Sequence, residues 1–149
     1  MPVDIVTEII IERPIARVAS YAADPDNAPR WYVNIKRVEW KTTPPLQTGS
    51  QIAFIAEFLG RRLAYTYRVN AFEPMRRLVM ATAEGPFPME TTYEWESVAN
   101  NGTRMRLRNR GTATGFSLIL APFMAWSIRR ANRNDLRRLK EILERDSKP

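Results

Sequence analysis

The fold is decided by a hairpin whose two arms read METTYEWE (residues 89–96) and TRMRLRNRG (residues 103–111). Asn100-Asn101-Gly102 lies between the arms and is typical of a hairpin turn. Successive side chains of a strand point to opposite faces, so each arm has one charged face and one mainly apolar face. The sequence therefore predicts an antiparallel pair of strands with two chemically different sides.

The charged face predicts the register of this hairpin. Three glutamates in the first arm face four arginines in the second arm. Opposite charges directly across an antiparallel pair stabilise it. The register that brings them together pairs Glu96 with Arg104, Glu94 with Arg106 and Glu90 with Arg110, and leaves Arg108 beside Thr92.

The other face mixes large apolar side chains with a few polar ones. It consists of Met89, Thr91, Tyr93 and Trp95 on the first arm and Met105, Leu107, Asn109 and Gly111 on the second. Such a face is compatible with the wall of a ligand cavity and equally with an ordinary core.

The rest of the chain continues this pattern with five more strands, short helices and one long helix. Alternating or β-branched runs predict strands at residues 3–12, 36–42, 51–59, 62–72 and 77–84. Pro14 suits the first turn of a short helix, and Asp24 with Pro25 predicts the start of another. The long helix spans about 117–144, with a kink or a late start expected at Pro122. Short connections after the first strand indicate an antiparallel meander.

The composition excludes several classes of protein. A chain of 149 residues fits one domain, spanning 1–149, with a substantial core. It contains neither cysteine nor histidine, so disulfides, thiolate metal sites and histidine-based catalysis are excluded, and we expect no metal and no cofactor. No apolar run approaches the roughly 20 residues of a spanning helix, and no signal peptide is apparent, so the expected location is cytoplasmic.

The net charge of +7 favours an anionic partner, but its distribution argues against nucleic acid. The charge of the four hairpin arginines is expected to be largely offset by the glutamates that face them. The remaining excess lies on the last helix, with few aromatic side chains to stack on bases. This basic helix is compatible with a solvated face or with an anionic membrane, RNA or an acidic partner.

The order of elements predicts an α+β architecture in which a curved sheet encloses the long helix. The sequence resembles the START-like (SRPBCC) helix-grip superfamily, which includes the major birch pollen allergen, polyketide cyclases and dehydrases, and lipid-transport proteins. The resemblance rests on residues 11–18 (IERPIARV), Asp24, Pro29, Trp31, Gly49-Ser50, Glu73-Pro74, residues 85–87 (GPF), residues 102–104 (GTR) and residues 129–140 (RRANRNDLRRLK).

This resemblance implies a seven-stranded curved antiparallel sheet, with two short helices after strand 1, wrapping a long C-terminal helix. It implies a cavity for a hydrophobic ligand between the sheet and that helix, without naming the ligand. None of the matching motifs is catalytic. The iron site of the related ring hydroxylases needs histidines, which this chain lacks.

The expected ligand-binding residues are the inner-face aromatic, methionine and polar side chains together with the inner stripe of the long helix. They are Trp31, Phe54, Phe58, Tyr65, Tyr67, Met80, Met89, Thr91, Tyr93, Trp95, Met105, Leu107, Asn109, Met124, Ile128, Asn132 and Asp135. Methionine adapts to ligands of variable shape, although it also fills gaps in cores. Trp31 is compatible with a core anchor or with the cavity entrance.

Asp135 is the candidate with the most distinctive chemistry. A carboxylate among apolar neighbours is costly unless it is paired or protonated. A salt bridge, or a hydrogen bond to a tyrosine or tryptophan of the sheet, is one expectation. The other is a ligand acceptor or general base with a raised pKa, with Tyr65, Tyr67 and Tyr93 as proton-transfer partners. These four residues are the catalytic candidates.

Phe123 and Trp126 lie away from the inner stripe of the long helix. They are expected to pack under the turn at residues 86–88 or under other local loops, to form a homodimer contact, or to touch a membrane beside Arg129 and Arg130.

Three functions therefore remain open. The first is binding or transport of a small hydrophobic molecule, such as a lipid, a quinone or an aromatic polyketide. The second is a metal-free polyketide cyclase, aromatase or dehydrase. The third is a surface-interaction protein that uses its basic helix.

Overall fold

The computed structural model describes residues 2–58, 60–84, 88–112 and 117–145. The first part of the chain forms β1 (Pro2–Ile11), α1 (Ile15–Ala23), the 3₁₀ turn η1 (Pro25–Asn27) and α2 (Ala28–Trp31). Six strands follow: β2 (Ile35–Trp40), β3 (Gln51–Phe58), β4 (Arg61–Glu73), β5 (Arg77–Glu84), β6 (Met89–Val98) and β7 (Gly102–Thr112). The last element is α3 (Ser117–Arg145).

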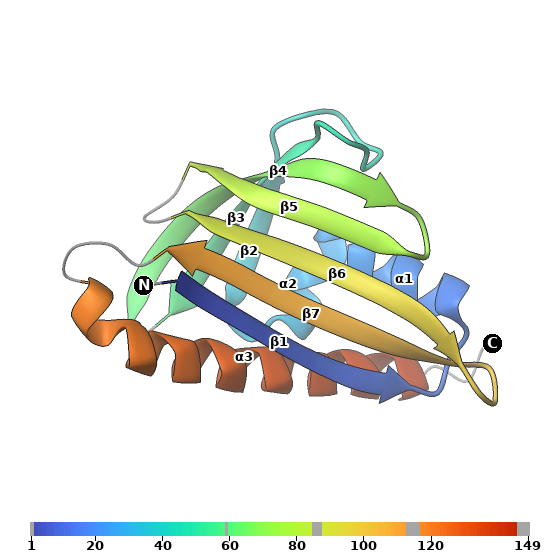
Figure 1. The fold of residues 1–149 in the computed structure, drawn as a ribbon. Helices are drawn as coiled ribbons and strands as arrows, with labels where there is room; N and C mark the ends of the chain where they lie inside the picture. The colour runs from blue at the N-terminus through green and yellow to red at the C-terminus, as the bar shows by residue number, and fades with distance from the viewer. Residues whose placement is uncertain (1, 59, 85–87, 113–116, 146–149) are drawn as a thin grey trace.

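The strands form one antiparallel sheet with the order β1-β7-β6-β5-β4-β3-β2. The meander from β2 to β7 and the α+β fold class are confirmed. β1 pairs along its whole length with β7, from Pro2 opposite Thr112 to Ile11 opposite Thr103. The first strand is thereby held by the last one, and α3 passes beneath this pair (Figure 1).

The predicted register of the β6–β7 hairpin is confirmed. Glu96 lies opposite Arg104, and Glu90 lies opposite Arg110. The turn places Asn100 and Asn101 at φ angles of 62° and 58°, a left-handed conformation that asparagine tolerates better than most residues.

The ion pairs on the outer face of this hairpin differ from the prediction in one respect. Arg104 pairs with Glu96, with 2.9 Å between the charged atoms, as expected. Arg106 instead pairs with Glu8 of β1 and not with Glu94. Arg108 binds Asp4 of β1 through two hydrogen bonds. The reason is that β7 has a second neighbour, β1, whose acidic side chains share this face.

The short helices begin where the sequence predicts. Pro14 precedes the first turn of α1, and the Asp24 carboxylate accepts a hydrogen bond from the Asp26 amide, 3.0 Å away, at the start of η1. The late start expected at Pro122 is wrong, because α3 already begins at Ser117. Within the described residues, no helix is both long enough and apolar enough to cross a membrane.

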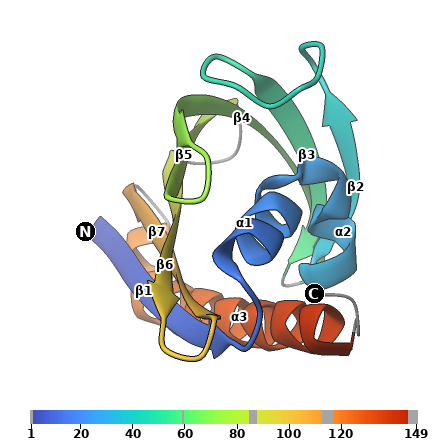
Figure 2. The same cartoon turned by 90° about the vertical axis from the view of Figure 1, so that its right-hand side faces the viewer.

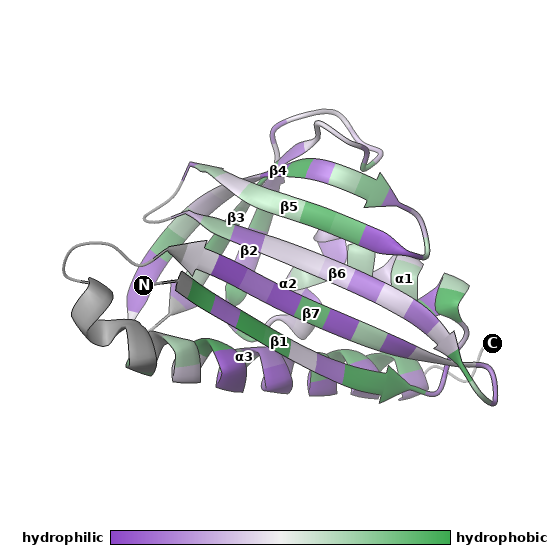
Figure 3. Cartoon of the chain, viewed as in Figure 1, coloured by the Kyte–Doolittle hydropathy of each residue, from purple (hydrophilic) through white to green (hydrophobic). Residues whose placement is uncertain are grey.

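The sheet bends around the helices. Viewed from one end, it curves into a partial barrel, with α1 and α2 on the concave side and α3 along its lower margin (Figure 2). Along part of β7, hydrophilic and hydrophobic residues alternate (Figure 3), because one face meets water and the other meets the interior. The inward residues Met105 and Leu107 are fully buried.

One end of the molecule, called here the closed end, is where β1 ends, β7 begins and α1 packs on the sheet. Its fully buried side chains include Ile11, Val18, Met105, Leu139 and Leu143. The C-terminal half of α3 contributes leucines to this end.

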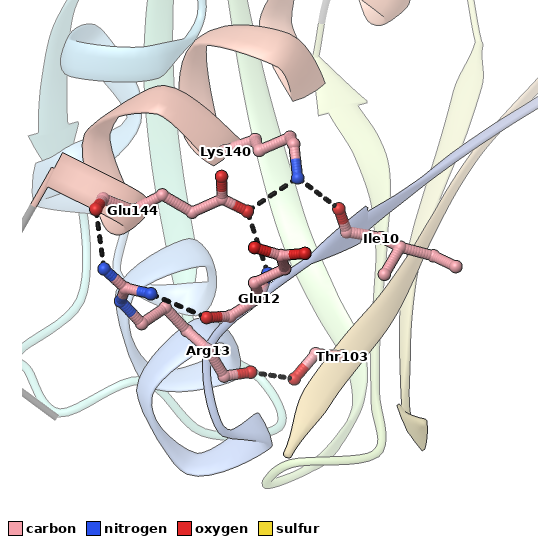
Figure 4. A network of polar contacts seen from close by, with 6 residues as sticks. All are labelled: Ile10, Glu12, Arg13, Thr103, Lys140 and Glu144. Carbon is pink, nitrogen blue, oxygen red and sulfur yellow. Dashed lines mark hydrogen bonds and ion pairs between the residues drawn. The ribbon is translucent and has the colours of Figure 1, made fainter. Parts of the chain in front are cut away.

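A polar network fixes α3 to the closed end (Figure 4). The Glu144 carboxylate accepts hydrogen bonds from the Glu12 amide (2.8 Å) and from Lys140 Nζ (2.6 Å). Lys140 Nζ also donates to the Ile10 carbonyl, and Arg13 donates to the Glu144 carbonyl. Side chains of the helix are thus bonded to the backbone at the end of β1.

Candidate functional site

A pocket of about 170 Å³ lies between the concave face of the sheet and the middle of α3, and it is partly open to solvent. Its walls are mainly apolar. It is lined by Tyr32, Asn34, Ile35, Phe54, Ala56, Leu63, Tyr65, Tyr67, Met80, Met89, Thr91, Tyr93, Asn109, Ile128, Ala131, Asn132 and Asp135. Strands β2 to β7 and the residues just before β2 thus provide the wall, and α3 provides the floor.

Most of the residues predicted to bind a ligand are brought together in this lining. They are Phe54, Tyr65, Tyr67, Met80, Met89, Thr91, Tyr93, Asn109, Ile128, Asn132 and Asp135. Four others, Trp31, Trp95, Met105 and Leu107, are buried in the core and do not line the pocket. The side chains of Phe58 and Met124 lie outside the described residues.

Six lining residues were not among the predicted ones, and they divide into two kinds. Ala56 and Leu63 share strand faces with Phe54 and Tyr65, and Ala131 lies on the inner stripe of α3, so periodicity could have identified them. The others, Tyr32, Asn34 and Ile35, lie at the junction of α2 and β2. The sequence there has no periodicity to indicate which side chains point inward.

Two tyrosines from distant parts of the chain meet at the pocket. The hydroxyl groups of Tyr32 and Tyr93 form a short hydrogen bond, and the Tyr32 ring packs on Trp31 with 4.1 Å between ring centroids. Burial raises the pKa of Tyr93 above its ordinary value, and it raises the pKa of Tyr65 to about 12. The tyrosine hydroxyls of the pocket are therefore protonated at neutral pH and can donate hydrogen bonds.

Asp135 is only 2% exposed and faces the pocket from α3. Its Oδ1 accepts a hydrogen bond from the Val33 amide, 2.9 Å away. Burial raises the pKa of Asp135 to about 7, although this hydrogen bond and the charge of Arg138 oppose the rise. The expectation of a raised pKa agrees with this result, whereas the partner shown is a backbone amide and not a tyrosine or tryptophan side chain.

Two asparagines supply further polar groups. Asn109 Oδ1 accepts a hydrogen bond from the Thr91 hydroxyl, 2.8 Å away. These two polar groups, on neighbouring strands, therefore serve as hydrogen-bond partners for each other. Asn132 lies one turn before Asp135 on α3 and is 5% exposed. Its amide nitrogen Nδ2 is buried without a hydrogen-bond partner. A buried donor of this kind is uncommon in folded proteins.

The pocket is mainly apolar and has one carboxyl group, three side-chain amides and several hydroxyls in its lining. No group of three or more acidic side chains that could hold a metal ion occurs in the described part of the chain, which contains no histidine or cysteine. The arrangement is suited to holding a small apolar molecule and to directing hydrogen bonds at its polar atoms.

Phe123 and Trp126 lie outside the pocket on the outer side of α3. They are 51% and 53% exposed, and their rings stack with 6.1 Å between centroids. The Arg130 guanidinium lies 5.5 Å from the centre of the Trp126 ring. The dimer or membrane contact expected of this pair stays a prediction. Of the turn at residues 86–88, under which the pair was expected to pack, only Pro88 lies within the described residues.

Comparison with solved structures finds the same fold in several bacterial proteins. A protein from Thermus thermophilus superposes with a TM-score of 0.83 and 18% identity, over 97% of this chain and 99% of that one. A START superfamily protein from Mycobacterium smegmatis has a TM-score of 0.80 and 12% identity, over 95% and 97% of the two chains. The Zhui aromatase/cyclase from Streptomyces sp. R1128 has a TM-score of 0.80 and 16% identity, over 99% and 97%.

At these identities the structural likeness establishes the fold alone, and no curated protein matches the chain by sequence. The family assignment comes from the sequence itself. Residues 2–144 match the family described as polyketide cyclase/dehydrase and lipid transport. The match spans nearly all of the chain and agrees with the resemblance drawn from its motifs. This protein therefore belongs to the polyketide cyclase/dehydrase and lipid-transport family.

Proposed function

We propose that this protein binds and carries a small hydrophobic molecule in the pocket between its sheet and α3. The observation that supports this most is the pocket itself, a mainly apolar space between the sheet and α3. Lipids, quinones and aromatic polyketides are the ligand classes with suitable chemistry. The family contains lipid-transport proteins, which agrees with a carrier role.

Affinity would come mainly from burial of apolar surface. Each 100 Å² of apolar area removed from water contributes about 2.5 kcal/mol. The aromatic rings of Phe54, Tyr65 and Tyr67 offer such area on the sheet side. The polar groups on α3 would set the orientation of the ligand.

The test is a thermal-shift screen of the ligand-free protein against lipids, sterols, quinones and aromatic polyketides. A ligand at about 100 times its Kd should raise the melting temperature by about 5–10 °C. If no compound in such a panel shifts the melting temperature, the carrier function is contradicted.

A pair of variants localises the binding. Ala56→Phe places a large ring in the pocket from β3, whereas Ile55→Phe places the same ring on the opposite face of that strand. A ligand held in the pocket should lose its thermal shift with Ala56→Phe and keep it with Ile55→Phe. An undiminished shift with Ala56→Phe would place the ligand elsewhere.

A second candidate function is a metal-free cyclase, aromatase or dehydrase that acts on a poly-β-ketone. Asp135 favours it, because burial raises the pKa of this carboxyl to about 7, close to that of an efficient general base. Asp135 would remove a proton from an acidic methylene between two ketones. A protonated tyrosine such as Tyr93 would donate a hydrogen bond to the enolate oxygen.

Mass spectrometry of a poly-β-keto thioester incubated with the protein tests this second function. Turnover should increase as the pH rises through 7, since only ionised Asp135 accepts a proton, and Asp135→Asn should abolish it. Cyclisation at the uncatalysed rate with the wild type would contradict the enzymatic role, and unchanged turnover with Asp135→Asn would contradict the role of this residue.

A further inference from the structure

The unpartnered amide of Asn132 carries information about the ligand, provided that the proposed carrier function holds. Its Nδ2 is buried in a residue that is 5% exposed and that lines the pocket. Leaving a buried donor without an acceptor destabilises the folded protein. Nδ2 itself is covered in the empty protein, and a turn of the Asn132 side chain toward the pocket would let a ligand oxygen accept from it and remove this cost.

The other polar atoms nearby do not provide that acceptor. Oδ1 of Asp135 accepts from the Val33 amide, and Oδ1 of Asn109 accepts from Thr91. The hydroxyls of Tyr32 and Tyr93 bond to each other. Nδ2 of Asn132 is therefore a buried donor of a pocket-lining residue that is left without an acceptor.

The charged residues around the pocket restrict the charge of the ligand. Among the described lining residues there is no lysine or arginine, and Asp135 is the one carboxyl group. The arginines of this part of α3, Arg129, Arg130 and Arg133, are exposed on its outer side. A ligand carboxylate would thus lose its hydration without gaining a cation, and it would lie near a second acid.

We infer that the pocket selects an uncharged, mainly apolar molecule that presents a carbonyl-type oxygen to Nδ2 of Asn132, and that it rejects the carboxylate of the same skeleton. Ketones, quinones and amides belong to the selected class. Free fatty acids and aryl carboxylates belong to the rejected one.

Three naphthalenes substituted at the same ring carbon provide a matched test at pH 8. Acetylnaphthalene offers a carbonyl oxygen, ethylnaphthalene offers none, and naphthoate offers a carboxylate. Isothermal titration should show the ketone binding about tenfold more tightly than the hydrocarbon, as expected for one hydrogen bond to a buried donor. Naphthoate should bind about a hundredfold more weakly than the ketone, or not measurably.

Asn132→Leu removes the donor and keeps the approximate volume. With this variant, acetylnaphthalene and ethylnaphthalene should bind with equal affinity, and ethylnaphthalene should still bind. Asn134→Leu is the matched control, because Asn134 lies on the same helix, is exposed and does not line the pocket. This control should retain the advantage of the ketone.

A measurement without ligand guards against a purely structural role of Asn132. If its amide has no partner in the empty protein, Asn132→Leu should melt at the same temperature as the wild type or higher. A melting temperature several degrees lower would overturn the inference. So would equal affinities of the wild type for the ketone and the hydrocarbon, or tight binding of naphthoate, and both results would leave the carrier function intact. If none of the three naphthalenes binds, the inference fails, and the thermal-shift panel decides separately whether the carrier function holds.

Discussion

The helix α3 contains two buried or partly buried acids whose pKa values are shifted in opposite directions. At the closed end, burial alone would raise the pKa of Glu144, but hydrogen bonds from the Glu12 amide and Lys140 outweigh it, so this pKa is lowered. Asp135, at the pocket, has one backbone hydrogen bond, and burial raises its pKa to about 7. The C-terminal half of the helix thus holds an acid that stabilises the fold, whereas its middle holds one whose ionisation is costly to the fold.

The largest expected effect concerns the pH dependence caused by Asp135. In the unfolded chain this carboxyl ionises near pH 3.8, but the folded protein holds its proton until about pH 7. Its contribution to the free energy of unfolding is therefore fully present below pH 3.8, falls by about 4 kcal/mol as the pH rises to 7, and stays constant above that.

Asp135→Asn should remove this loss and make the protein more stable than the wild type at pH 8, because the amide oxygen can still accept from Val33. Urea unfolding at several pH values measures the difference. Glu141→Gln, on the exposed side of α3, is the control and should leave the pH profile unchanged. If Asp135→Asn is no more stable than the wild type at pH 8, the ionised Asp135 does not destabilise the folded protein and the prediction is wrong.

The second largest effect is expected when core and pocket residues of α3 are truncated, because the two kinds of residue should lose different amounts of stability. Leu139 is fully buried at the closed end, so Leu139→Ala should cost about 3 kcal/mol through lost burial and a new cavity. Ile128 borders an existing pocket, so Ile128→Ala should cost clearly less, about 1 kcal/mol. The midpoint of chemical denaturation compares them. If the two variants lost equal amounts of stability, the pocket would be as tightly packed as the core.

A smaller effect is expected at the polar network of the closed end. Glu144→Ala removes the acceptor of the Glu12 amide and of Lys140 and should cost about 1–2 kcal/mol at pH 7. Because the pKa of Glu144 is lowered, its contribution is present above pH 4.5 and should disappear as the solution becomes more acidic. Glu141→Ala should change the stability by less than about 0.5 kcal/mol, and a similar loss in both variants would argue against a specific network.

The smallest effect is expected at the exposed aromatic pair. Trp126 is 53% exposed, so Trp126→Ala should alter the free energy of unfolding by less than about 0.5 kcal/mol. A loss of more than about 1 kcal/mol, measured by urea unfolding, would show that the pair is part of the core and not of a surface.

The fold could be predicted largely from the sequence because its signals are local. Alternation defined the β6–β7 faces, and the charges fixed the pairing of Glu96 with Arg104. The pairing of β1 with β7 joins residues about a hundred positions apart, and no local pattern indicates it. The ion pairs of Arg106 and Arg108 were therefore assigned to the wrong strand or missed.

The same distinction applies to the site. Residues on periodic elements, such as Tyr67, Thr91 and Asp135, were predicted to face the interior, and they line the pocket. Tyr32 was not among the predicted site residues, because its place depends on how the α2–β2 junction meets the sheet. The hydrogen bond from Val33 to Asp135 likewise depends on tertiary packing across the concave side.

The floor of the pocket has a consequence for how the protein is made. All strands that form the pocket wall precede α3 in the chain, so the ribosome completes the wall before it supplies the floor. During that interval the aromatic concave surface faces water and is open to chaperones or to unwanted association. A nascent chain halted before Ser117 should consequently aggregate, and under the proposed carrier function a ligand would enter only after α3 has been translated.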